Sequence, residues 1–412
     1  MYFVYSIITY LVFILSPIIF FFRIINGKED PKRFREKFCI YHKKNNLNSI
    51  WFHAVSVGEI MSIIPILKKI EKNNKIQQII VTSSTKSSAK IFETQKFKKT
   101  IHRYYPLDTN YLNLKFINFW KPQAAFFVDS EIWPNMIKNL HKQKIPIIIL
   151  NARITKKSFQ KWKIINNFSK SIFKKISLAL ASDIQTKQFL KKLGVKKIIF
   201  AGNLKYYGIN NIKNLDTKSY KYKFKNFKIL CAASTHHGEE KLISNLHKII
   251  KRKEKNLLTI IIPRHIERIP KIMDDLRKNN LKVITHSSNK NLKENTDIYL
   301  VDTYGEASKF YNLSNVTFVG GSIVKHGGQN PLEPARLGNH IVNGPHISNF
   351  SEIYKFLLKN KISITSSNII SIKNFVEKKI DKKISNKNKK KIFNIGKKIL
   401  NNNMYYLNKY IL

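Results

Sequence analysis

The feature that most constrains the fold is a repeated alternation of short apolar runs with amphipathic stretches, from Ile50 to about Val342. The apolar runs are rich in β-branched residues, a pattern typical of strands that are buried on both faces. Between them, apolar residues recur at helical spacing, as at Ile60, Ile63 and Leu67. Strands that alternate with helices predict an α/β fold built on parallel sheets.

The predicted strands fall into two series, separated by a polar stretch from Asn203 to Asn226 that is rich in Lys and Tyr. The first series is 50–54, 79–82, 124–128, 145–150, 178–181 and 198–201. The second series is 229–233, 258–262, 283–285, 299–301, 316–319 and 341–342. The 412 residues are enough for two domains with separate cores.

We therefore expect two Rossmann-like domains, an N-terminal one at 25–205 and a C-terminal one at 227–377, joined by a linker at 206–226. Ligands of such folds bind outside the carboxyl ends of the strands. Two domains of this kind in tandem usually present those ends to a shared crevice, so a central cleft is expected. The remaining segment, 378–412, is predicted to be a basic helix, which either exposes a solvated face or packs back across the first domain.

The N-terminal segment Tyr2–Phe22 is almost entirely apolar and has about the 20 residues needed to cross the hydrocarbon of a bilayer. It lacks the positive start and small-residue end of a cleaved signal peptide. Basic residues follow it, beginning at Arg23, and none precedes it, which predicts a cytoplasmic location for the body of the protein. We expect residues 1–24 to be a membrane anchor. Pro17 leaves open a helix that lies in the membrane surface instead.

The charge balance narrows the possible partners. The chain has 75 Lys and Arg residues against 25 Asp and Glu, a formal charge of +50, which by itself suggests nucleic acid. However, Lys, Asn and Ile are abundant everywhere, and no recognisable nucleic-acid-binding motif is present. Part of the excess therefore reflects composition, and the remainder favours a phospholipid surface or phosphorylated substrates. The two cysteines, Cys39 and Cys231, occur in unrelated contexts and indicate a reducing compartment.

The stretch Val316–Arg336 predicts a ligand site. It reads as a strand, a glycine-rich polar loop and a helix that begins at Pro331. Backbone N–H groups at a helix start attract anions, and glycine lets a ligand approach the backbone closely. Glu333, one turn into this helix, is suited to accept hydrogen bonds from ribose hydroxyls. The alternative is a loop in which Gly and Pro only turn the chain.

Two charged residues at strand ends are candidates for chemistry. Glu59 opens a helix, whose positive end would keep the carboxylate ionised and fit for a general base, although an acidic residue is also common there for the dipole alone. Arg264 follows a strand and a proline, and is suited to phosphate oxygens or, alternatively, to a domain-closing salt bridge.

Other reaction classes are poorly supported by the sequence. Three histidines at strand ends, His236, His237 and His265, lack metal-binding spacing, and no Asp-x-Asp pair is present to hold a divalent ion, so no catalytic metal is expected. The chain has no Gly-x-Ser-x-Gly elbow and no Walker-type loop, which argues against a serine hydrolase and a common nucleotide triphosphatase.

Six ordered motifs together resemble the 3-deoxy-D-manno-octulosonic acid (Kdo) transferases of lipopolysaccharide assembly. They are Trp51–Glu59, Ser130–Asn135, Asn151–Arg153, Ser234–Glu240, Pro263–His265 and Gly327–Pro334. The likeness extends in register from the anchor to about Phe350.

The resemblance implies a GT-B glycosyltransferase at the cytoplasmic face of the inner membrane, with a single N-terminal anchor. It implies that Kdo moves from CMP-Kdo to a lipid A precursor, with inversion, without a metal and without a cofactor. The expected partners are therefore this donor, this lipid acceptor and the membrane phospholipid, and no nucleic acid. The alternative within enzymes is another nucleotide-sugar GT-B transferase that acts on a lipid acceptor.

The resemblance also implies roles for single residues. Glu59 matches the catalytic base, and Glu131 and Lys205 match residues that assist the transition state. The donor-binding segments would be Pro263 and Arg264, then Tyr304, Gly305 and Glu306, then Asn330, Pro331, Leu332 and Glu333. The sequence departs from the family pattern at Gln329, Tyr207 and Ser88, which bears on acceptor fit more than on the reaction class.

Overall fold

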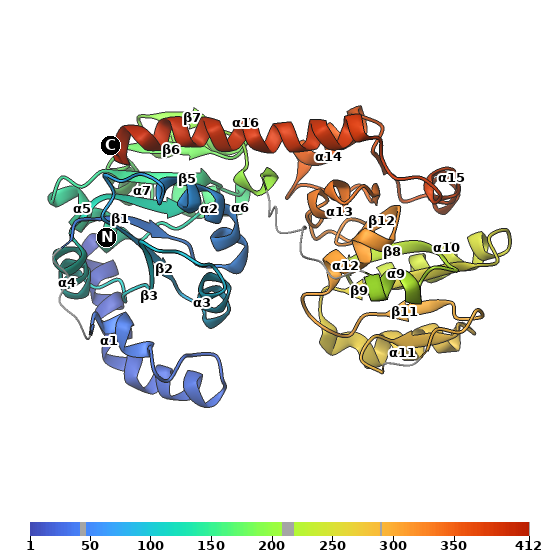
Figure 1. Cartoon of the computed structure of the whole chain (residues 1–412). Coiled ribbons are helices and arrows are strands. Elements are labelled where there is room, and N and C mark those ends of the chain that lie inside the picture. Colours follow the sequence, from blue (N-terminus) through green and yellow to red (C-terminus); the bar gives the residue numbers. More distant parts are fainter. Residues whose placement is uncertain (42–46, 208–217, 289–290, 412) are drawn as a thin grey trace. The chain divides into compact units, whose positions relative to one another are not determined.

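The computed structural model describes residues 1–41, 47–207, 218–288 and 291–411, and it forms two compact units. Unit 1 comprises Met1–Ile209 together with Ile395–Leu412, and unit 2 comprises Asn210–Asn394. Each unit contains one seven-stranded sheet in which every pairing is parallel (Figure 1).

The sheet of unit 1 has the order β3-β2-β1-β4-β5-β6-β7. Its strands are β1 Ser49–His53, β2 Gln78–Ser83, β3 Thr100–Tyr104, β4 Pro122–Val128, β5 Ile147–Ala152, β6 Leu178–Ala181 and β7 Ile198–Phe200. The chain adds strands on one side of β1 and then crosses to the other side at β4. The carboxyl ends of β1 and β4 therefore flank a topological switch point, where ligands of such sheets bind.

Helices cover both faces of this sheet. They are α1 Tyr2–Ile25, η1 Phe34–Phe38, α2 Val57–Ile70, α3 Lys86–Glu93, α4 Asn110–Trp120, α5 Pro134–Lys142, α6 Lys156–Ile164, α7 Asn166–Phe173, α8 Ile184–Leu193 and η2 Leu204–Tyr206. Alternate strand residues point to opposite faces, so Trp51 and Phe127 pack in one core, and Phe52 and Phe126 in the other.

The long helix α16, Asn386–Ile411, completes the second of these cores. Leu400 and Leu407 are 1% and 0% exposed and pack in the same cluster as Phe52. Gly396 allows the close approach, because a Cβ at this position would lie 2.5 Å from the carbonyl oxygen of Tyr206. The second half of the basic C-terminal segment thus packs back onto unit 1, while lysines such as Lys397 and Lys409 form its solvated face.

The sheet of unit 2 has the order β10-β11-β9-β8-β12-β13-β14, with its switch point between β8 and β12. Its strands are β8 Lys228–Thr235, β9 Leu257–Pro263, β10 Val283–Thr285, β11 Ile298–Leu300, β12 Val316–Val319, β13 His340–Asn343 and β14 Ser363–Thr365. Its helices are α9 Lys218–Lys223, α10 Glu239–Lys251, η4 Ile266–Arg268, α11 Ile269–Lys278, α12 Ala307–Leu313, α13 Leu332–Arg336, α14 Ser351–Lys359, α15 Ile369–Lys379 and the first part of α16.

All twelve strands predicted from apolar runs are present, and the two that the sequence did not reveal are β3 and β14. Each of these is the outermost strand of its sheet, where one edge is unpaired and burial is incomplete. Of the predicted linker 206–226, residues 208–217 lie outside the described residues. Its remainder includes α9, after which Phe224 is 2% exposed in a core of unit 2.

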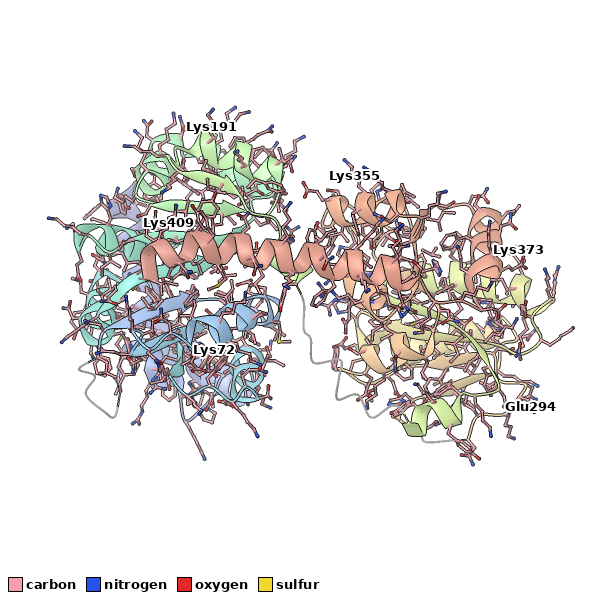
Figure 2. The ribbon with its side chains drawn as sticks, turned by 45° about the horizontal axis from the view of Figure 1, so that its top comes forward. Lys72, Lys191, Glu294, Lys355, Lys373 and Lys409 are labelled. Atoms are coloured by element: carbon pink, nitrogen blue, oxygen red, sulfur yellow. The ribbon has the colours of Figure 1, made fainter. Side chains whose placement is uncertain are left out.

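The excess of basic residues is found on the surface. Lys72 and Lys191 extend outward from unit 1, and Lys355 extends outward from unit 2 (Figure 2). Among the described residues, α1 is the one helix that is long and apolar enough to cross a membrane by length and composition.

Candidate functional site

Three residues at strand ends adopt a backbone conformation that side chains rarely tolerate. Asp129 follows β4 with φ of 65°, Asn151 lies near the end of β5 with φ of 55°, and Ser234 lies near the end of β8 with φ of 55°. Left-handed backbone in non-glycine residues is costly and clusters at functional sites. These positions lie at the carboxyl ends of the strands of both sheets, where the sequence predicts the catalytic and donor-binding residues.

Glu59 sits in the first turn of α2, and the residue that caps this helix, Ser56, contacts it twice. The Ser56 hydroxyl accepts from the Glu59 backbone N–H at 3.3 Å and donates to Glu59 Oε1 at 2.8 Å. The Val55 backbone N–H donates to Glu59 Oε2 at 2.8 Å. The side chain is held in place by these contacts but remains partly exposed.

Burial raises the pKa of Glu59, although hydrogen bonds from Ser56 and Val55 oppose the change. The nearby carboxylates Glu131 and Asp129 raise this pKa further. The expectation that the helix start would favour the ionised form is therefore outweighed by desolvation. A raised pKa brings a carboxylate closer to neutral pH, where a general base is most effective.

The predicted residues Glu131 and Lys205 lie in the same neighbourhood. Trp133 Nε1 donates to Glu131 Oε2 at 3.0 Å, and Lys205 Nζ lies 3.1 Å from Asp129 Oδ2. Asp129 and Glu131 both raise the pKa of Glu59, so three carboxyl groups lie near one another in unit 1, and Lys205 pairs with one of them, Asp129.

Sequence reasoning gave no role to Asp129 or to His53, although both lie within or beside quoted motifs. His53 is 0% exposed, and its Nε2 lies 3.7 Å from Glu131 Oε2. Its Nδ1 is hydrogen-bonded with Thr82 Oγ1 at 2.9 Å. Burial lowers the pKa of His53, and Glu131 opposes this change. His53 therefore lies beside Glu131 on its buried side.

Ser88, one of the departures from the family pattern, supports the Glu59 loop. Its side chain is buried, and Ser88 Oγ donates to the Val55 carbonyl oxygen at 2.8 Å. The same residue, Val55, donates its N–H to Glu59. The start of α3 is in this way tied to the loop that positions Glu59.

In unit 2 the predicted donor-binding residues follow the carboxyl ends of β9, β11 and β12, and each contacts a different partner. Arg264 follows β9, its side chain is exposed, and its backbone N–H donates to Thr235 O at 3.0 Å. Tyr304 is 62% exposed, and its hydroxyl donates to Glu267 Oε1 at 3.3 Å. Glu333 is exposed and accepts from Ser308 Oγ, which links α13 to α12.

The other predicted donor-binding residues have mostly backbone roles. Gly305 has φ of 86°, which lets the chain turn between β11 and α12. Glu306 pairs with Lys309 at 2.6 Å. Asn330 Oδ1 accepts from the Leu332 N–H at 3.0 Å, which shapes the start of α13. Three further predicted residues, Pro263, Pro331 and Leu332, are buried.

The glycine-rich loop after β12 is held by a carboxylate of the chain itself, which accepts from three of the loop's backbone N–H groups. Glu239 is 0% exposed, and its Oε1 accepts from Ser322 and Ile323 at 3.0 Å each. Its Oε2 accepts from Gly321 at 2.8 Å and from His236 at 2.9 Å. These contacts fix the shape of the loop. The N–H groups at the start of α13, where the sequence predicts an anion site, are not among the partners of Glu239.

Three histidines approach one another beside this loop. The ring of His236 lies 4.3 Å from that of His326 and 6.2 Å from that of His265, measured between centroids. Burial lowers the pKa of His236, and His326 lowers it further. Within the described ranges, no group of three or more His, Cys, Asp or Glu side chains is placed to hold a metal ion. The absence of a catalytic metal stays a prediction.

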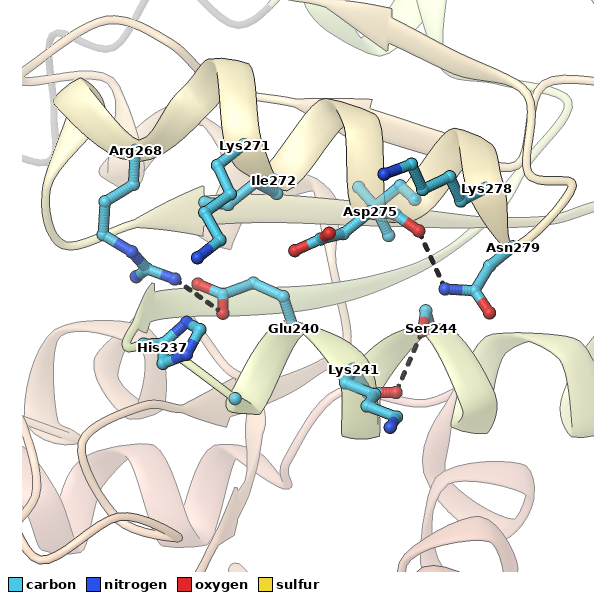
Figure 3. Close-up of a pocket in the computed structure, with 12 residues that line it drawn as sticks. His237, Glu240, Lys241, Ser244, Arg268, Lys271, Ile272, Asp275, Lys278 and Asn279 are labelled. Atoms are coloured by element: carbon cyan, nitrogen blue, oxygen red, sulfur yellow. Dashed lines mark hydrogen bonds and ion pairs between the residues drawn. The ribbon is translucent and has the colours of Figure 1, made fainter.

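A separate pocket of about 390 Å³ lies on unit 2 between α10 and α11 (Figure 3). Arg268 Nη2 contacts Glu240 Oε2 at 3.0 Å at one end, and Asn279 lies at the other. None of the predicted donor-binding residues lines this pocket. It is therefore distinct from the strand-end group of Arg264, Tyr304 and Glu333.

Comparison with known proteins decides the family. Residues 32–207 match the family model described as 3-deoxy-D-manno-octulosonic-acid transferase (kdotransferase). The 3-deoxy-D-manno-octulosonic acid transferase of Rickettsia bellii is 34% identical over 380 residues, which cover 90% of this chain and 90% of the relative. The chain belongs to the Kdo transferase family. The corresponding transferase of Haemophilus influenzae is 32% identical over 361 residues, covering 85% of this Kdo transferase and 84% of the relative.

Solved structures define the fold of this Kdo transferase. The UDP-GlcNAc 2-epimerase of Neisseria meningitidis, bound to UDP-GlcNAc, is 14% identical and superimposes with a TM-score of 0.57 over 88% of this chain and 99% of that one. With two parallel-sheet units and an N-terminal apolar helix, the predicted GT-B fold class is confirmed. The Kdo transferase is a glycosyltransferase, and this favours the predicted activity over a nucleic-acid-binding protein and over transfer of another sugar.

Proposed function

We propose that this Kdo transferase moves Kdo from CMP-Kdo to a lipid A precursor, with inversion at the anomeric carbon and without a metal, and that Glu59 is the general base. The observation that carries the proposal is the environment of Glu59. Its carboxylate is partly exposed, its position is fixed by Ser56 and Val55, and its pKa is raised by burial and by neighbouring carboxylates.

The chemistry of the acceptor requires such a base. A sugar hydroxyl has a pKa far above 7, so a positioned carboxylate that removes its proton as the new bond forms contributes roughly 10²- to 10⁴-fold to the rate. The proton moves to Glu59, the hydroxyl oxygen bonds to the anomeric carbon, and the bond from that carbon to the CMP phosphate breaks. Attack from the face opposite the leaving group inverts the anomeric carbon.

The departing CMP phosphate gains negative charge. In the proposal, basic side chains stabilise this charge. Arg264 is exposed at the end of β9 and offers a planar guanidinium for two phosphate oxygens. Lys205 adds a positive charge, which its ion pair with Asp129 holds in place. The proposal also assigns Glu131 to support of the transition state. A nucleoside monophosphate carries no diphosphate that would need a chelated metal, so these groups suffice in the proposed reaction.

The nucleoside of the donor is assigned to the strand-end group of unit 2. Glu333 is exposed and is suited to accept from ribose hydroxyls, while Tyr304 presents an exposed aromatic ring. Glu239 supports this group indirectly because it fixes the neighbouring loop at Gly321. No cofactor and no nucleic acid take part in the proposed reaction.

The acceptor is a lipid, and the proposal places the enzyme at the cytoplasmic face of the inner membrane through α1. Fourteen large apolar side chains between Phe3 and Ile25 are exposed on this helix. The surplus of basic residues favours a surface of anionic phospholipid.

The test is mass spectrometry of a lipid A precursor incubated with CMP-Kdo and the purified protein. The expected result is a mass increase of the acceptor by one or more Kdo residues, in a buffer that contains a metal chelator. Turnover with a UDP-sugar and none with CMP-Kdo would overturn the donor assignment. Loss of turnover in the chelator, restored by a divalent ion, would overturn metal independence.

A further inference from the structure

The N-terminal helix α1 has two faces with different surroundings. One face contacts the body of unit 1 through Tyr2, Tyr5, Ser6, Thr9, Phe13, Ser16 and Phe20. The opposite face exposes apolar side chains at helical spacing over the same length. Among them, Phe3 is 76% exposed, Leu11 54%, Ile18 60% and Ile25 65%.

Polar contacts fix the first three turns of the contacting face. The Tyr5 hydroxyl donates to Asp108 Oδ2 at 2.8 Å, and Asp108 is 6% exposed. The Ser6 hydroxyl donates to Asn135 Oδ1 at 3.2 Å, while Asn135 Nδ2 donates to Thr9 Oγ1 at 3.2 Å. A helix that simply crosses lipid has no need for this set of hydrogen bonds to a globular domain.

The second half of α1 is fixed through η1. The Phe20 ring lies 5.7 Å from that of Phe38, and Lys37 Nζ lies 5.1 Å from the Phe20 centroid. Glu29, whose side chain is 0% exposed, pairs with Lys37 at 2.8 Å and with Arg23 at 3.0 Å.

The 3-10 helix η1 is in turn bound to the edge strand β3. The Tyr104 backbone N–H donates to Glu36 Oε2 at 2.9 Å, and Arg33 Nη2 donates to the His102 carbonyl oxygen at 3.0 Å. The contacts of α1 with unit 1 therefore run from Tyr2 to Phe20. At 1.5 Å per residue this is about 27 Å, close to the thickness of the hydrocarbon layer.

Because these contacts extend over about the thickness of the hydrocarbon layer, α1 cannot both stay packed on unit 1 and cross the membrane. If α1 crossed the bilayer with its contacts intact, Asp108, Glu29 and Lys37 would enter the hydrocarbon with it, at a cost of several kcal/mol for charged groups. If α1 left unit 1 in order to cross, Asp108 and Asn135 would lose hydrogen-bond partners, and the Phe38 ring that packs on Phe13 and Phe20 would be exposed to water.

We propose that α1 lies along a single leaflet, with its docked face on unit 1 and its apolar face among the acyl chains of that leaflet. Unit 1 then sits on one side of the membrane and no segment of α1 reaches the other side. This inference rests on the proposed membrane attachment and specifies its geometry. The partner is a phospholipid bilayer, because the exposed face is apolar and is followed by basic residues from Arg23 onward.

The experiment measures the depth of single labels in the full-length protein on vesicles of phosphatidylethanolamine and phosphatidylglycerol. Nitroxides are attached at Phe3→Cys, Leu11→Cys, Ile18→Cys and Ile25→Cys, with the exposed Lys191→Cys as the aqueous control. The native cysteines Cys39 and Cys231 are buried, at 3% and 0% exposure, and remain in place. Depth is measured by collision with oxygen and with a water-soluble nickel chelate.

The proposal predicts that all four α1 labels lie at similar depth in one leaflet, while Lys191→Cys stays in water. A deep label at Leu11 with shallow labels at Phe3 and Ile25 would overturn it in favour of a spanning helix. Four labels in water would overturn it in favour of no insertion.

A transfer assay of the same variants in detergent separates this inference from the proposed function. If the labelled variants transfer Kdo but the four α1 labels lie at different depths, the result would count against the proposed geometry alone. Similar depths in a protein whose unlabelled form cannot transfer Kdo would count against the function alone.

Discussion

Glu59 in unit 1 and Glu239 in unit 2 occupy matching places, in the first turn of the helix that follows the first strand of each sheet. Their surroundings differ. Glu59 is partly exposed and accepts from one backbone N–H and one hydroxyl of its own loop. Glu239 is fully buried and accepts four backbone N–H groups.

Two glutamates at matching positions thus have different surroundings, so position and residue type alone do not fix the role of a carboxylate. Both carboxylate oxygens of Glu239 accept hydrogen bonds that hold the loop at Gly321, so Glu239 is a positioning residue. Glu59 keeps a raised pKa and access to solvent, which are the properties of a base. Substitutions of each carboxylate and of its neighbours test the two roles.

The largest effect is expected for Glu59→Ala, because no other group is assigned to accept the acceptor proton. The turnover number should fall by roughly 10²- to 10⁴-fold, while affinity for CMP stays within about twofold of the wild type. Turnover by mass spectrometry and CMP binding by calorimetry check the two parts. Glu59→Gln is the matched control, because it keeps the size of the side chain and also removes the base. Wild-type turnover in either variant would remove Glu59 from this role.

A smaller effect on rate but a larger one on stability is expected for Glu239→Gln. The amide group would point its own N–H toward two backbone N–H donors, and each buried donor left unmatched costs about 1–3 kcal/mol. The free energy of unfolding of unit 2 should fall, and the KM for the donor should rise more than kcat falls. Chemical denaturation and donor titrations measure these changes. An unchanged KM with normal stability would mean that the loop does not depend on Glu239.

Arg264→Ala should mainly weaken donor binding. Loss of a charge-assisted hydrogen bond to phosphate costs about 1.5–3 kcal/mol, which corresponds to roughly a 10- to 150-fold rise in the Kd for CMP. Arg264→Lys should recover part of the affinity because it keeps the charge but loses the two-pronged geometry. Calorimetric titration of CMP tests both variants. Equal affinity of all three proteins would identify Arg264 as structural.

The smallest expected effect is on the pH profile. The pKa of Glu59 is raised above its ordinary value of 4.5, so activity should be lost, as pH falls, at a higher pH than for an ordinary glutamate. A carboxyl whose pKa is raised by folding adds stability at low pH, and this contribution is lost as pH rises through the folded-state pKa.

Glu131→Gln sharpens this prediction, because Glu131 is one of the charges that raise the pKa of Glu59. The acid limb of the kcat profile should move to lower pH in this variant, whatever happens to the maximal rate. Turnover measured across the acid range tests the shift. An unmoved limb would show that Glu131 does not act on Glu59 through its charge.

The sequence predicts strands that contain an apolar run, including the edge strands β7 and β10, and misses the edge strands β3 and β14, which lack one. Strands such as β1 are buried on both faces and read as continuous apolar runs, as at Ile50–Ala54. The edge strand β3 alternates buried and half-buried residues, and its pattern is too weak to detect. The strand-end position of Glu59, Glu131 and Arg264 follows from the same apolar pattern.

The contacts that assign roles could not be predicted, because they join residues far apart in the chain. Glu239 meets its loop partners 82 to 84 residues away, and Tyr5 meets Asp108 at a separation of 103 residues. Their residue types are informative only once the fold brings them together.

The central claim is that Glu59 acts in the chemical step. It is tested most directly by a single-turnover measurement of Kdo transfer with Glu59→Ala at saturating CMP-Kdo and lipid A precursor. The account predicts that the rate constant stays roughly 10²- to 10⁴-fold below wild type when both substrates are saturating. A rate constant that returns to the wild-type value at saturation would contradict it, because Glu59 would then contribute to binding and not to proton removal.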